Sequence, residues 1–464
     1  MTTDAGPVRR QAREVALQVL CAVEERGAYA NLALSQGLER AGLSPSDRSF
    51  ATELVYGTVR RRLTLDWVLE QFLTRPFDAL APWLQSLLRL SAYQLLYLEH
   101  VPPEAVCNEA VELAKRRGHR GIAGLVNAVL RSLLRGRSEI TWPDPQTDPV
   151  EYLSVRESHP AWLVRRWLQR LGYAETAQLL AADNATPPLT LRANRCRMGR
   201  DELLARLAGR GLAAEPCRWA PEGVTLRSRT GSVERLPEIT EGLAQVQDEA
   251  SMLVARLAAP EPGHRVLDCA SAPGGKATHL AELMGDSGHV CAFDVHPGKL
   301  RLVEENAARL GLRSVQTAVV DALAVGSLPE FAEAFDRCLL DAPCTGLGVL
   351  RRKADSRWRK AEGDIPALAR QQGAMLASAA RTVKRGGRLV YSTCSTEREE
   401  GEDVIERFLE GEGHAFRLLD AGEILTAQGI PARTEDSLTA GRYLRLWPQR
   451  HGTDGFFAAA LVRL

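Results

Sequence analysis

Residues 265–284 read RVLDCASAPGGKATHLAELM, and this stretch decides the fold expected for the second half of the chain. A short apolar run ends at Asp268, a loop with the adjacent glycines Gly274 and Gly275 follows, and a segment with helical spacing comes next. Glycine lets the backbone approach a ligand closely, and the first N–H groups of a helix are free to bind one. The loop is neither GxGxxG nor GxxxxGK[ST], so a dinucleotide or a nucleoside triphosphate is not the first choice of ligand.

The same strand-then-helix pattern repeats towards the C-terminus. Further strands are predicted at residues 289–295, 315–321, 335–342 and 387–394. Such alternation predicts a mostly parallel sheet with helices on both faces. The closing segments RYLRLWP (442–448) and GFFAAALVRL (455–464) are interpreted as two last strands, forming a hairpin at one sheet edge. Residues 246–464 are therefore predicted to form an α/β, Rossmann-like domain.

The first half of the chain has a different character. Apolar residues recur at helical spacing in residues 12–25, 49–73 and 121–135, which predicts an all-α domain over residues 1–140. The proline-rich stretch TWPDPQTDPVEY (141–152) is typical of a linker. In residues 150–245, two amphipathic helices precede strand-like PLTLRANR, a further helix and strand-like GVTLRS, which predicts a small α+β domain.

Composition narrows the class of protein. The chain has 464 residues, of which 45% are hydrophobic and 25% charged, as in ordinary globular proteins. Its 59 Lys and Arg balance 58 Asp and Glu, so any affinity for nucleic acid must come from local patches. The nine cysteines include no CxxC pair, so neither a disulfide framework nor a metal site is expected. No apolar run is long enough for a membrane span, and a cytoplasmic location without membrane contact is predicted.

Two aspartates follow the glycine-rich loop at the ends of predicted strands. Asp294 ends the second strand and suits ribose hydroxyls, and Asp321 ends the third and suits an adenine amino group. The alternative is an ordinary strand–helix turn in which these aspartates cap helices. The glycine loop together with acidic strand ends favours a ligand, because open α/β sheets bind ligands at the carboxyl ends of their strands. An adenosine-bearing ligand without a triphosphate is predicted, and S-adenosylmethionine fits.

Two cysteines also stand at strand ends. DAPCTG places Asp341 and Cys344 after the fourth strand, and STCST places Cys394 after the fifth. Cysteine is often only a small buried residue, but a thiol beside polar groups at a strand end can be activated as a nucleophile. Carbon 5 of a pyrimidine becomes nucleophilic only after a thiolate adds to carbon 6. Two such cysteines beside a methyl donor therefore point to methylation of carbon, without showing which cysteine attacks.

These motifs are similar to those of a known family. VLDCASAPGGKATHL, LLDAPCTGLGVLRRKADSRWR, YSTCSTEREE and HGTDGFFAAALVRL resemble the Sun/RsmB family of bacterial RNA cytosine-C5 methyltransferases. LVYGTVRRRLTLDWVLEQF, SAYQLLYLEHVPPEAVCNEAVELAK and GLVNAVLRSLLR resemble that family's NusB-like helical domain. HPAWLVRRWLQRLG, TLRANR and VQDEAS resemble its connecting RNA-binding region. The resemblance covers nearly the whole chain.

The resemblance implies a function and a role for each matching residue. It implies methyl transfer from S-adenosylmethionine to carbon 5 of a cytosine in small-subunit (16S) rRNA, through a covalent cysteine–carbon 6 adduct. Cys394 would be the nucleophile, Cys344 would assist release of the adduct, and Asp341 would contact the cytosine near the cofactor. The implied cofactor-binding residues are Ala270, Ser271, Ala272, Pro273, Gly274, Gly275, Lys276, Asp294, Asp321 and Asp341.

The chain departs from the family pattern at two motifs. The family usually reads D-x-C-A-A-P-G-G-K, whereas here the cysteine is Cys269 and Ala270 stands in its usual place. After TCS the family often has P-E-E-N, and here Arg398 and Gly401 replace the proline and the asparagine. The glycines, the lysine and both cysteines of the site remain.

Two basic segments are candidate RNA contacts. RRKADSRWRK (351–360) has six basic residues around Trp358 and follows the DAPC motif, so RNA binding is favoured there. For KRRGHR (115–120), binding and a solvated charged face are equally supported. Two alternative functions remain, the same chemistry on another RNA such as tRNA, and a non-catalytic RNA-binding assembly factor. A monomer is the default expectation.

Overall fold

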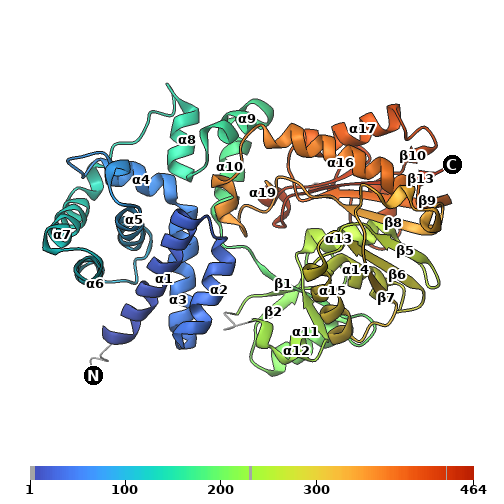
Figure 1. Ribbon diagram of the computed structural model, residues 1–464, viewed down its shortest axis with the longest axis horizontal. Helices are drawn as coiled ribbons and strands as arrows, with labels where there is room; N and C mark the ends of the chain where they lie inside the picture. The colour runs from blue at the N-terminus through green and yellow to red at the C-terminus, as the bar shows by residue number, and fades with distance from the viewer. Residues whose placement is uncertain (1–5, 229–232, 435) are drawn as a thin grey trace. The chain divides into compact units, whose positions relative to one another are not determined.

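The computed structural model describes residues 6–228, 233–434 and 436–464 and forms two compact units (Figure 1). The first unit extends through Ala185 and also includes Leu350–Arg359 from much further along the chain. The second unit holds Thr186–Val349 and Lys360–Leu464. The predicted fold class, a helical N-terminal part, a small α+β part and an α/β part, is confirmed. The domain boundaries given above stay predictions.

The first unit is built from helices around one apolar core. Its helices are α1 Gly6–Arg26, α2 Ala30–Ala41, α3 Pro45–Arg60, α4 Arg62–Glu70, α5 Pro82–Tyr97, α6 Pro103–Arg117, α7 Arg120–Arg135, α8 Pro149–Glu157, α9 Ala161–Leu171 and α10 Tyr173–Asn184. The helical spacing in residues 49–73 proves to belong to two helices, because Arg61 leaves the helical conformation with φ −98° and ψ 14°. The two amphipathic helices α9 and α10, predicted as part of the small α+β domain, group with this unit.

A small antiparallel sheet opens the second unit. It contains β1 Leu189–Ala193, β2 Ala214–Pro216, β3 Gly223–Leu226 and β4 Ala244–Val246 in the order β2-β3-β1-β4. Helices α11 (Arg200–Gly209) and α12 (Pro237–Thr240) accompany it. The apolar residues of β1 and β3 pack into one core with α11, because alternate strand residues point to the same face.

The large sheet of the second unit carries the functional loops. Its strands are β5 Arg265–Asp268, β6 His289–Asp294, β7 Val315–Val319, β8 Phe335–Asp341, β9 Val383–Thr393, β10 Phe416–Leu418, β11 Thr439–Ala440, β12 Tyr443–Leu446 and β13 Phe456–Arg463. The order is β11-β12-β13-β9-β8-β5-β6-β7, and β10 also pairs with β13. Strands β5 to β9 are parallel to one another, and β13 is antiparallel to β9. The parallel sheet predicted from the sequence is confirmed.

Helices cover both faces of this sheet (Figure 1). Along β5, Val266 belongs to the core shared with α13 (Glu249–Ala258), α14 (Gly275–Leu283) and α15 (Pro297–Leu310). Its neighbour Leu267 belongs to the opposite core, shared with α16 (Asp364–Ala380) and α17 (Glu402–Glu410). Because successive residues face opposite sides, a strand buried on both faces is apolar at nearly every position.

The C-terminal strands differ from the prediction in detail. The two last strands do form an antiparallel pair, β12 with β13, as predicted. The sheet edge beyond them is β11, which has only two residues and follows no apolar alternation. Strand β9 begins at Val383, before the double glycine where the predicted strand begins. Among the described residues, no helix is both long and apolar enough to cross a bilayer.

Candidate active site

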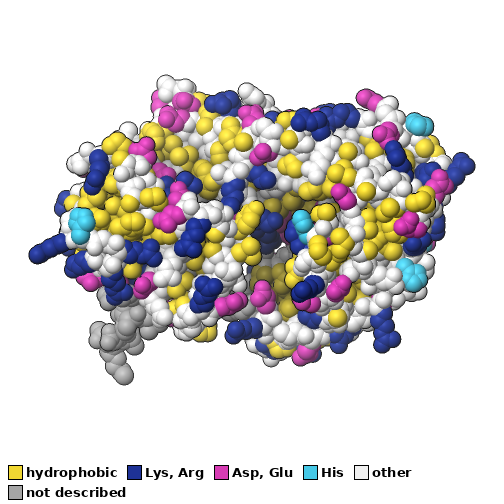
Figure 2. Space-filling model, in the orientation of Figure 1, with side chains coloured by type: hydrophobic (Ala, Val, Ile, Leu, Met, Phe, Trp, Pro, Cys, Tyr) yellow, Lys and Arg dark blue, Asp and Glu magenta, His cyan; other side chains and the backbone are white. Residues whose placement is uncertain are grey.

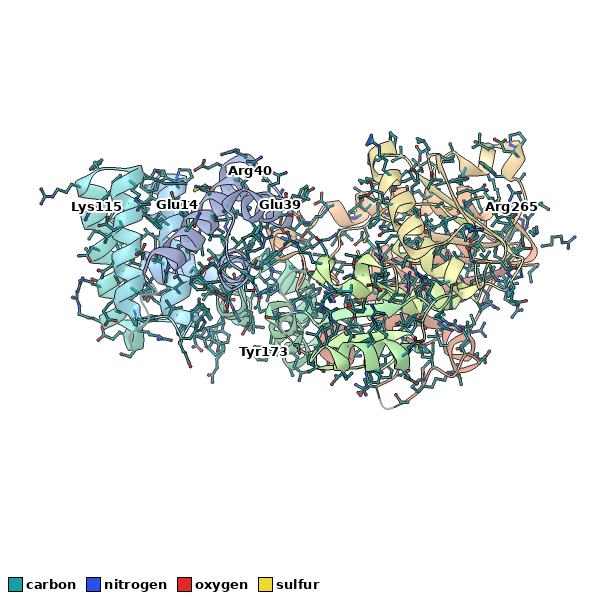
Figure 3. The ribbon with its side chains drawn as sticks, turned by 90° about the horizontal axis from the view of Figure 1, so that it is seen from below. Glu14, Glu39, Arg40, Lys115, Tyr173 and Arg265 are labelled. Atoms are coloured by element: carbon teal, nitrogen blue, oxygen red, sulfur yellow. The ribbon has the colours of Figure 1, made fainter. Side chains whose placement is uncertain are left out.

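The predicted site residues gather at one edge of the large sheet. Asp341 ends β8, the glycine-rich loop follows β5, and Asp294 ends β6, and these three strands are neighbours in the parallel sheet. Arg265, at the amino end of β5, marks the opposite edge (Figure 3). Since parallel strands end at the same edge, the topology brings together residues that lie far apart in the sequence.

The glycine-rich loop leads directly into helix α14. Gly274 adopts φ +96°, and a Cβ there would lie only 3.0–3.3 Å from Val303, so the position requires glycine. Beside Gly275, in contrast, the nearest atom to an added Cβ is 3.8 Å away, on the amide of Gln247. The loop is therefore packed tightly against α15 at Gly274, whereas at Gly275 a side chain would make only ordinary van der Waals contact.

Arg192, in the motif TLRANR of β1, is hydrogen-bonded to this loop and to side chains of α14. Its guanidinium is fully buried and donates to the Gly275 carbonyl at 2.7 Å, to Thr278 Oγ1 at 3.1 Å and to Glu282 Oε1 at 2.7 Å. Burial raises the pKa of Glu282, and the charge of Arg192 opposes that effect. The sequence assigned this motif to RNA binding only by resemblance, whereas the structure shows Arg192 fixing the glycine-rich loop.

The two aspartates predicted to bind the adenosine part lie at the end of β6 and just after β7. Asp294 is half-buried, and its carboxylate accepts from the backbone N–H of Ala272 at 3.3 Å and of His296 at 2.9 Å. Asp321 is exposed two residues after β7 and accepts from the N–H of Leu323 at 2.9 Å. Both carboxylates accept hydrogen bonds within their own turns, as the capping alternative expects, and a ligand role at these positions stays a prediction.

Lys276 and Asp341 form an ion pair at the centre of the site. Lys276 Nζ lies 2.6 Å from Asp341 Oδ2, and Ser392 Oγ donates to Asp341 Oδ1 at 2.7 Å. Burial opposes the charge on Lys276, but Asp341 and the nearby Cys394 outweigh it and raise the pKa of the lysine. Lys276 is therefore a fixed positive charge beside Cys394.

The structure brings the two predicted cysteines into contact. Cys344 Sγ and Cys394 Sγ lie 3.3 Å apart, although 50 residues separate them, and both side chains are half-buried. The hydrogen bond with Cys394, burial and the charge of Cys394 raise the pKa of Cys344 well above its usual value. Cys344 thus keeps its proton, whereas Cys394 lies near the positive charge of Lys276. This asymmetry favours Cys394 as the thiolate.

Glu400 is a site residue that the sequence did not reveal. Its fully buried carboxylate accepts from Thr345 N at 2.8 Å and from Ser395 Oγ at 2.5 Å, and it also contacts Thr345 Oγ1. These partners are the residues that directly follow Cys344 and Cys394. Gln372 Nε2 donates to the same carboxylate at 3.0 Å. One buried acid therefore ties together the two cysteine loops, a link between distant segments that no local pattern shows.

Asp268, which ends β5, is a second missed residue. Its side chain is buried beneath the glycine-rich loop, and burial followed by repulsion from Asp341 raises its pKa to about 7. A carboxyl with such a pKa is typical of functional sites. The sequence showed an acidic residue after an apolar strand here, but not that it is removed from solvent.

In the basic segment 351–360, where the sequence favoured RNA binding, the central Arg357 and Trp358 are bound to the protein itself. Arg357 is fully buried in the first unit and donates to the Ser158 carbonyl at 3.0 Å, to Asn184 Oδ1 at 3.0 Å and to the Asp183 carbonyl at 3.2 Å. Burial lowers its pKa to about 9. The half-buried Trp358 donates its indole N–H to the Val59 carbonyl at 3.0 Å. The ring of Trp358 packs against the helical core, which disfavours a stacking contact with a base.

The second basic segment lies on the surface of the first unit. Lys115 points away from α6 (Figure 3), and its ammonium lies 2.7 Å from Glu112. Arg116 lies 3.3 Å from Glu14 of α1. Carboxylates thus partly neutralise this segment, which favours a solvated face over an RNA contact.

Charge is also mixed elsewhere on the surface. In Figure 2, Lys and Arg side chains alternate with Asp and Glu over the visible face, as the near-zero net charge suggested. Within the part of the chain that the structure describes, no group of three or more His, Cys, Asp or Glu side chains could hold a metal ion.

The chain matches known proteins over its whole length. Three family models match it: the NusB family over residues 10–135, a ferredoxin-like domain of RsmF/B-like methyltransferases over 159–234, and 16S rRNA methyltransferase RsmB/F over 255–462. It is 40% identical to a probable ribosomal RNA small subunit methyltransferase B of Bacillus subtilis, with 97% of this chain and 98% of that protein covered.

Further relatives agree with these matches. A ribosomal RNA small subunit methyltransferase B of Pseudomonas putida is 36% identical, with 97% of this chain and 98% of that protein covered. The crystal structure of PH0851 superposes with a TM-score of 0.81 at 27% identity, covering 98% of this chain and 99% of that one. The chain therefore belongs to the RsmB/F family of S-adenosylmethionine-dependent methyltransferases, the family of the 16S rRNA enzymes.

Proposed function

We propose that this protein transfers a methyl group from S-adenosylmethionine to carbon 5 of a cytosine in small-subunit rRNA, through a covalent adduct with Cys394. The observation that supports this most is the contact of two thiols, 3.3 Å apart, beside the Lys276–Asp341 ion pair. Methylation of an amino group or a hydroxyl needs no thiol nucleophile, whereas carbon 5 of a pyrimidine does. The substrate class is the one that the names of its relatives give.

The loop residues fit S-adenosylmethionine. The glycine-rich loop leads into the first turn of α14, Asp294 ends β6, and Asp321 lies two residues after β7. We propose that residues 270–276 hold the methionine part and that the two aspartates hold the ribose and the adenine. When bound, the cofactor supplies an electrophilic methyl group.

The first half of the reaction uses Cys394, Lys276 and Asp341. Cys394 adds through Sγ to carbon 6 of the cytosine, which forms an S–C bond and moves the C5=C6 electron pair onto carbon 5. The charge of Lys276 stabilises the thiolate before it attacks. Ring N3, where negative charge develops during the addition, takes a proton from water. The Asp341 carboxylate, positioned by Ser392 at 2.7 Å, accepts a hydrogen bond from that N3–H until the proton is returned when the adduct breaks down. Carbon 5 then becomes the nucleophile that takes the methyl group.

The second half releases the product. Carbon 5 loses its proton to water, the C5=C6 bond forms again, and the S–C bond breaks with its electron pair returning to Cys394 Sγ. Cys344 retains its proton because the hydrogen bond with Cys394 and burial raise its pKa, so it donates to the departing thiolate. Without that donor the adduct should persist.

A trapped adduct tests this proposal. The variant Cys344→Ala is mixed with S-adenosylmethionine and unmodified small-subunit rRNA, and the mixture is run on a denaturing gel. A slow-migrating protein–RNA band is expected, and it should be absent from Cys344→Ala/Cys394→Ala. Cys196→Ala, which removes an exposed thiol outside the site, is the matched control and should behave as wild type.

Other outcomes separate the alternatives. A band only in Cys394→Ala would mean that the two cysteine roles are exchanged. Methylation of tRNA but not of rRNA by the wild-type protein would assign the same chemistry to a different RNA. Binding of rRNA without methylation of any RNA would support the non-catalytic assembly factor. The cytoplasmic location stays a prediction.

A further inference from the structure

A polar cavity of about 430 Å³ lies within the second unit, apart from the cofactor loop. It is lined by the start of β1, by β2 and β3, by the first residues of α13 and by the end of α19 (Pro448–His451). Arg218 and Arg227 stand among its lining residues, together with Thr190, Thr225 and Thr453. A cavity of this size holds one nucleotide, and cations with hydroxyls suit a sugar and a phosphate.

Glu249 gives the cavity a hydrogen-bond acceptor that the protein itself does not use. Its side chain is 7% exposed, and its Oε1 accepts from the backbone N–H of Ala220 at 2.8 Å and from that of Trp219. Both of these hydrogen bonds go to Oε1, no donor of the described residues is paired with Oε2, and Glu249 lines the cavity. Burial raises the pKa of this carboxyl to about 7. Since Oε2 lacks a donor in the described part of the chain and the side chain lines the cavity, this oxygen is available to a ligand with N–H donors.

The two arginines of the cavity are held only loosely. Arg227 pairs with Glu215, and Arg218 pairs with Asp436, and the side chains of both arginines are more than half exposed, at 59% and 55%. Exposed ion pairs contribute little to stability, so exchange of a carboxylate for an RNA phosphate is easy. The cavity thus combines a buried acceptor for a base with exposed cations for the backbone.

The cavity is also coupled to the reacting cysteines. Asp248, which lines it, accepts from the N–H of Asp454 at 3.2 Å. The next residue, Gly455, donates to the Gly348 carbonyl at 2.7 Å, and the Gly348 N–H donates to the Cys394 carbonyl at 2.9 Å. A short series of hydrogen bonds therefore links the lining of the cavity to the loop that carries Cys394.

We propose that this cavity is an RNA subsite that receives one unpaired nucleotide close to the target cytosine and prefers a base with an amino group to uracil. The proposal rests on the proposed function and adds to it a position of sequence preference. Guanine, adenine and cytosine each offer an amino group to Glu249 Oε2. Uracil offers only its ring N–H, which two carbonyl oxygens flank, and these oxygens would face the carboxylate.

The test is a comparison of sequence preferences. The methylated cytosine is first mapped in rRNA, and three positions on each side of it are then randomised among A, G and U in a transcript pool. The pool is methylated at pH 8 by wild type, Glu249→Gln and the control Glu261→Gln, an exposed carboxyl outside the cavity. Bisulfite sequencing then gives the base frequencies around 5-methylcytosine.

Wild type should disfavour uracil at one position by about ten-fold, the worth of a hydrogen bond to a charged group. In Glu249→Gln the amide oxygen still accepts from the two backbone N–H groups. Its amide N–H₂ group then takes the place of Oε2 and presents a donor, instead of an acceptor, to the cavity. The preference of this variant at that position should vanish or turn towards uracil, while Glu261→Gln follows wild type. Unchanged preferences in Glu249→Gln would overturn the subsite. No methylation of rRNA by wild type would instead overturn the proposed function.

A second variant covers the case in which Glu249→Gln does not fold. Arg227→Gln changes only an exposed side chain. It should raise KM for RNA several-fold while kcat and KM for S-adenosylmethionine stay at their wild-type values. An unchanged KM for RNA would contradict the proposal.

Discussion

Two polar segments follow strand β8 within twenty residues of each other, and their side chains contact different partners. The loop of Asp341 and Cys344 presents its polar groups to the site, where distant strands supply Lys276 and Cys394 as partners. The segment 350–359 buries its central arginine among the carbonyls of the first unit. In sequence the second segment has the stronger signal of a nucleic-acid contact. The charge content of a segment therefore does not tell whether its side chains bind a ligand or form hydrogen bonds within the protein.

The largest expected effect comes from the cysteine loop. Cys394→Ala should lower methyl transfer by at least about a thousand-fold, because the reaction loses its covalent nucleophile. The free energy of unfolding should change little, since the side chain is small and half-buried. Methylation rates and a denaturant titration check both parts. Retained methylation would show that the cysteine loop, like segment 350–359, is structural.

The next largest effect should come from Arg357. Arg357→Met leaves the carbonyls of Ser158 and Asp183 without their donor inside the first unit, which should cost about 3–5 kcal/mol of unfolding free energy. Lys353→Met, in the same segment but exposed, should cost less than about 0.5 kcal/mol. Chemical denaturation measures the difference. Equal stabilities, with a loss of RNA affinity in Arg357→Met alone, would return the segment to the role of an RNA contact.

Asp268 should make stability depend on pH. Its pKa is about 7 when folded and near 4 when unfolded, so the unfolded chain releases this proton first as pH rises. Stability from this group is therefore complete below about pH 4 and is lost between about pH 4 and 7. Asp268→Asn removes the effect and should gain about 4 kcal/mol relative to wild type between pH 4 and pH 8. Denaturant titrations at several pH values measure this difference, and a constant difference would contradict the assignment.

A smaller effect should follow from loosening the link between the cysteine loops. In the wild type, the Glu400 carboxylate accepts from donors that include Thr345 N and Ser395 Oγ. Glu400→Gln replaces one carboxylate oxygen with an N–H₂ group, which cannot accept from them. We expect kcat to fall roughly ten- to thirty-fold, because the transition state loses about 1.5–2 kcal/mol of stabilisation when the two cysteine loops are less well aligned. KM for S-adenosylmethionine should not change. Glu410→Gln, exposed at the end of α17, is the control. A fall in stability with kcat intact would make Glu400 purely structural.

The smallest effect concerns Trp358. Trp358→Phe keeps the ring against the helical core and removes the hydrogen bond to the Val59 carbonyl, so about 1 kcal/mol of stability should be lost. RNA affinity should not change. A weaker affinity at unchanged stability would support RNA binding through Trp358.

The sequence predicted the strands of the catalytic half well, because parallel strands buried on both faces are continuous apolar runs. Strand β5 and the glycine-rich loop lie where the sequence indicated them, and Cys344 and Cys394 follow the ends of β8 and β9 as expected, although their direct contact was not predicted. Shorter elements were missed, since β10 and β11 have three and two residues and carry no pattern of their own. The helix break at Arg61 was also missed, because helical spacing continues on both sides of it.

The sequence by itself determined the parts that depend on local pattern, namely the helical N-terminal half, the parallel sheet, the glycine-rich loop and the chemical types of the site residues. The tertiary structure alone decided which polar residues are solvated, which are buried and which meet each other. Glu400, Asp268 and Arg357 all look like surface residues in the sequence. Their burial depends on partners that lie far away along the chain, such as Thr345 for Glu400 and Asn184 for Arg357. Burial and charge partners act through space, and the sequence records only neighbours along the chain.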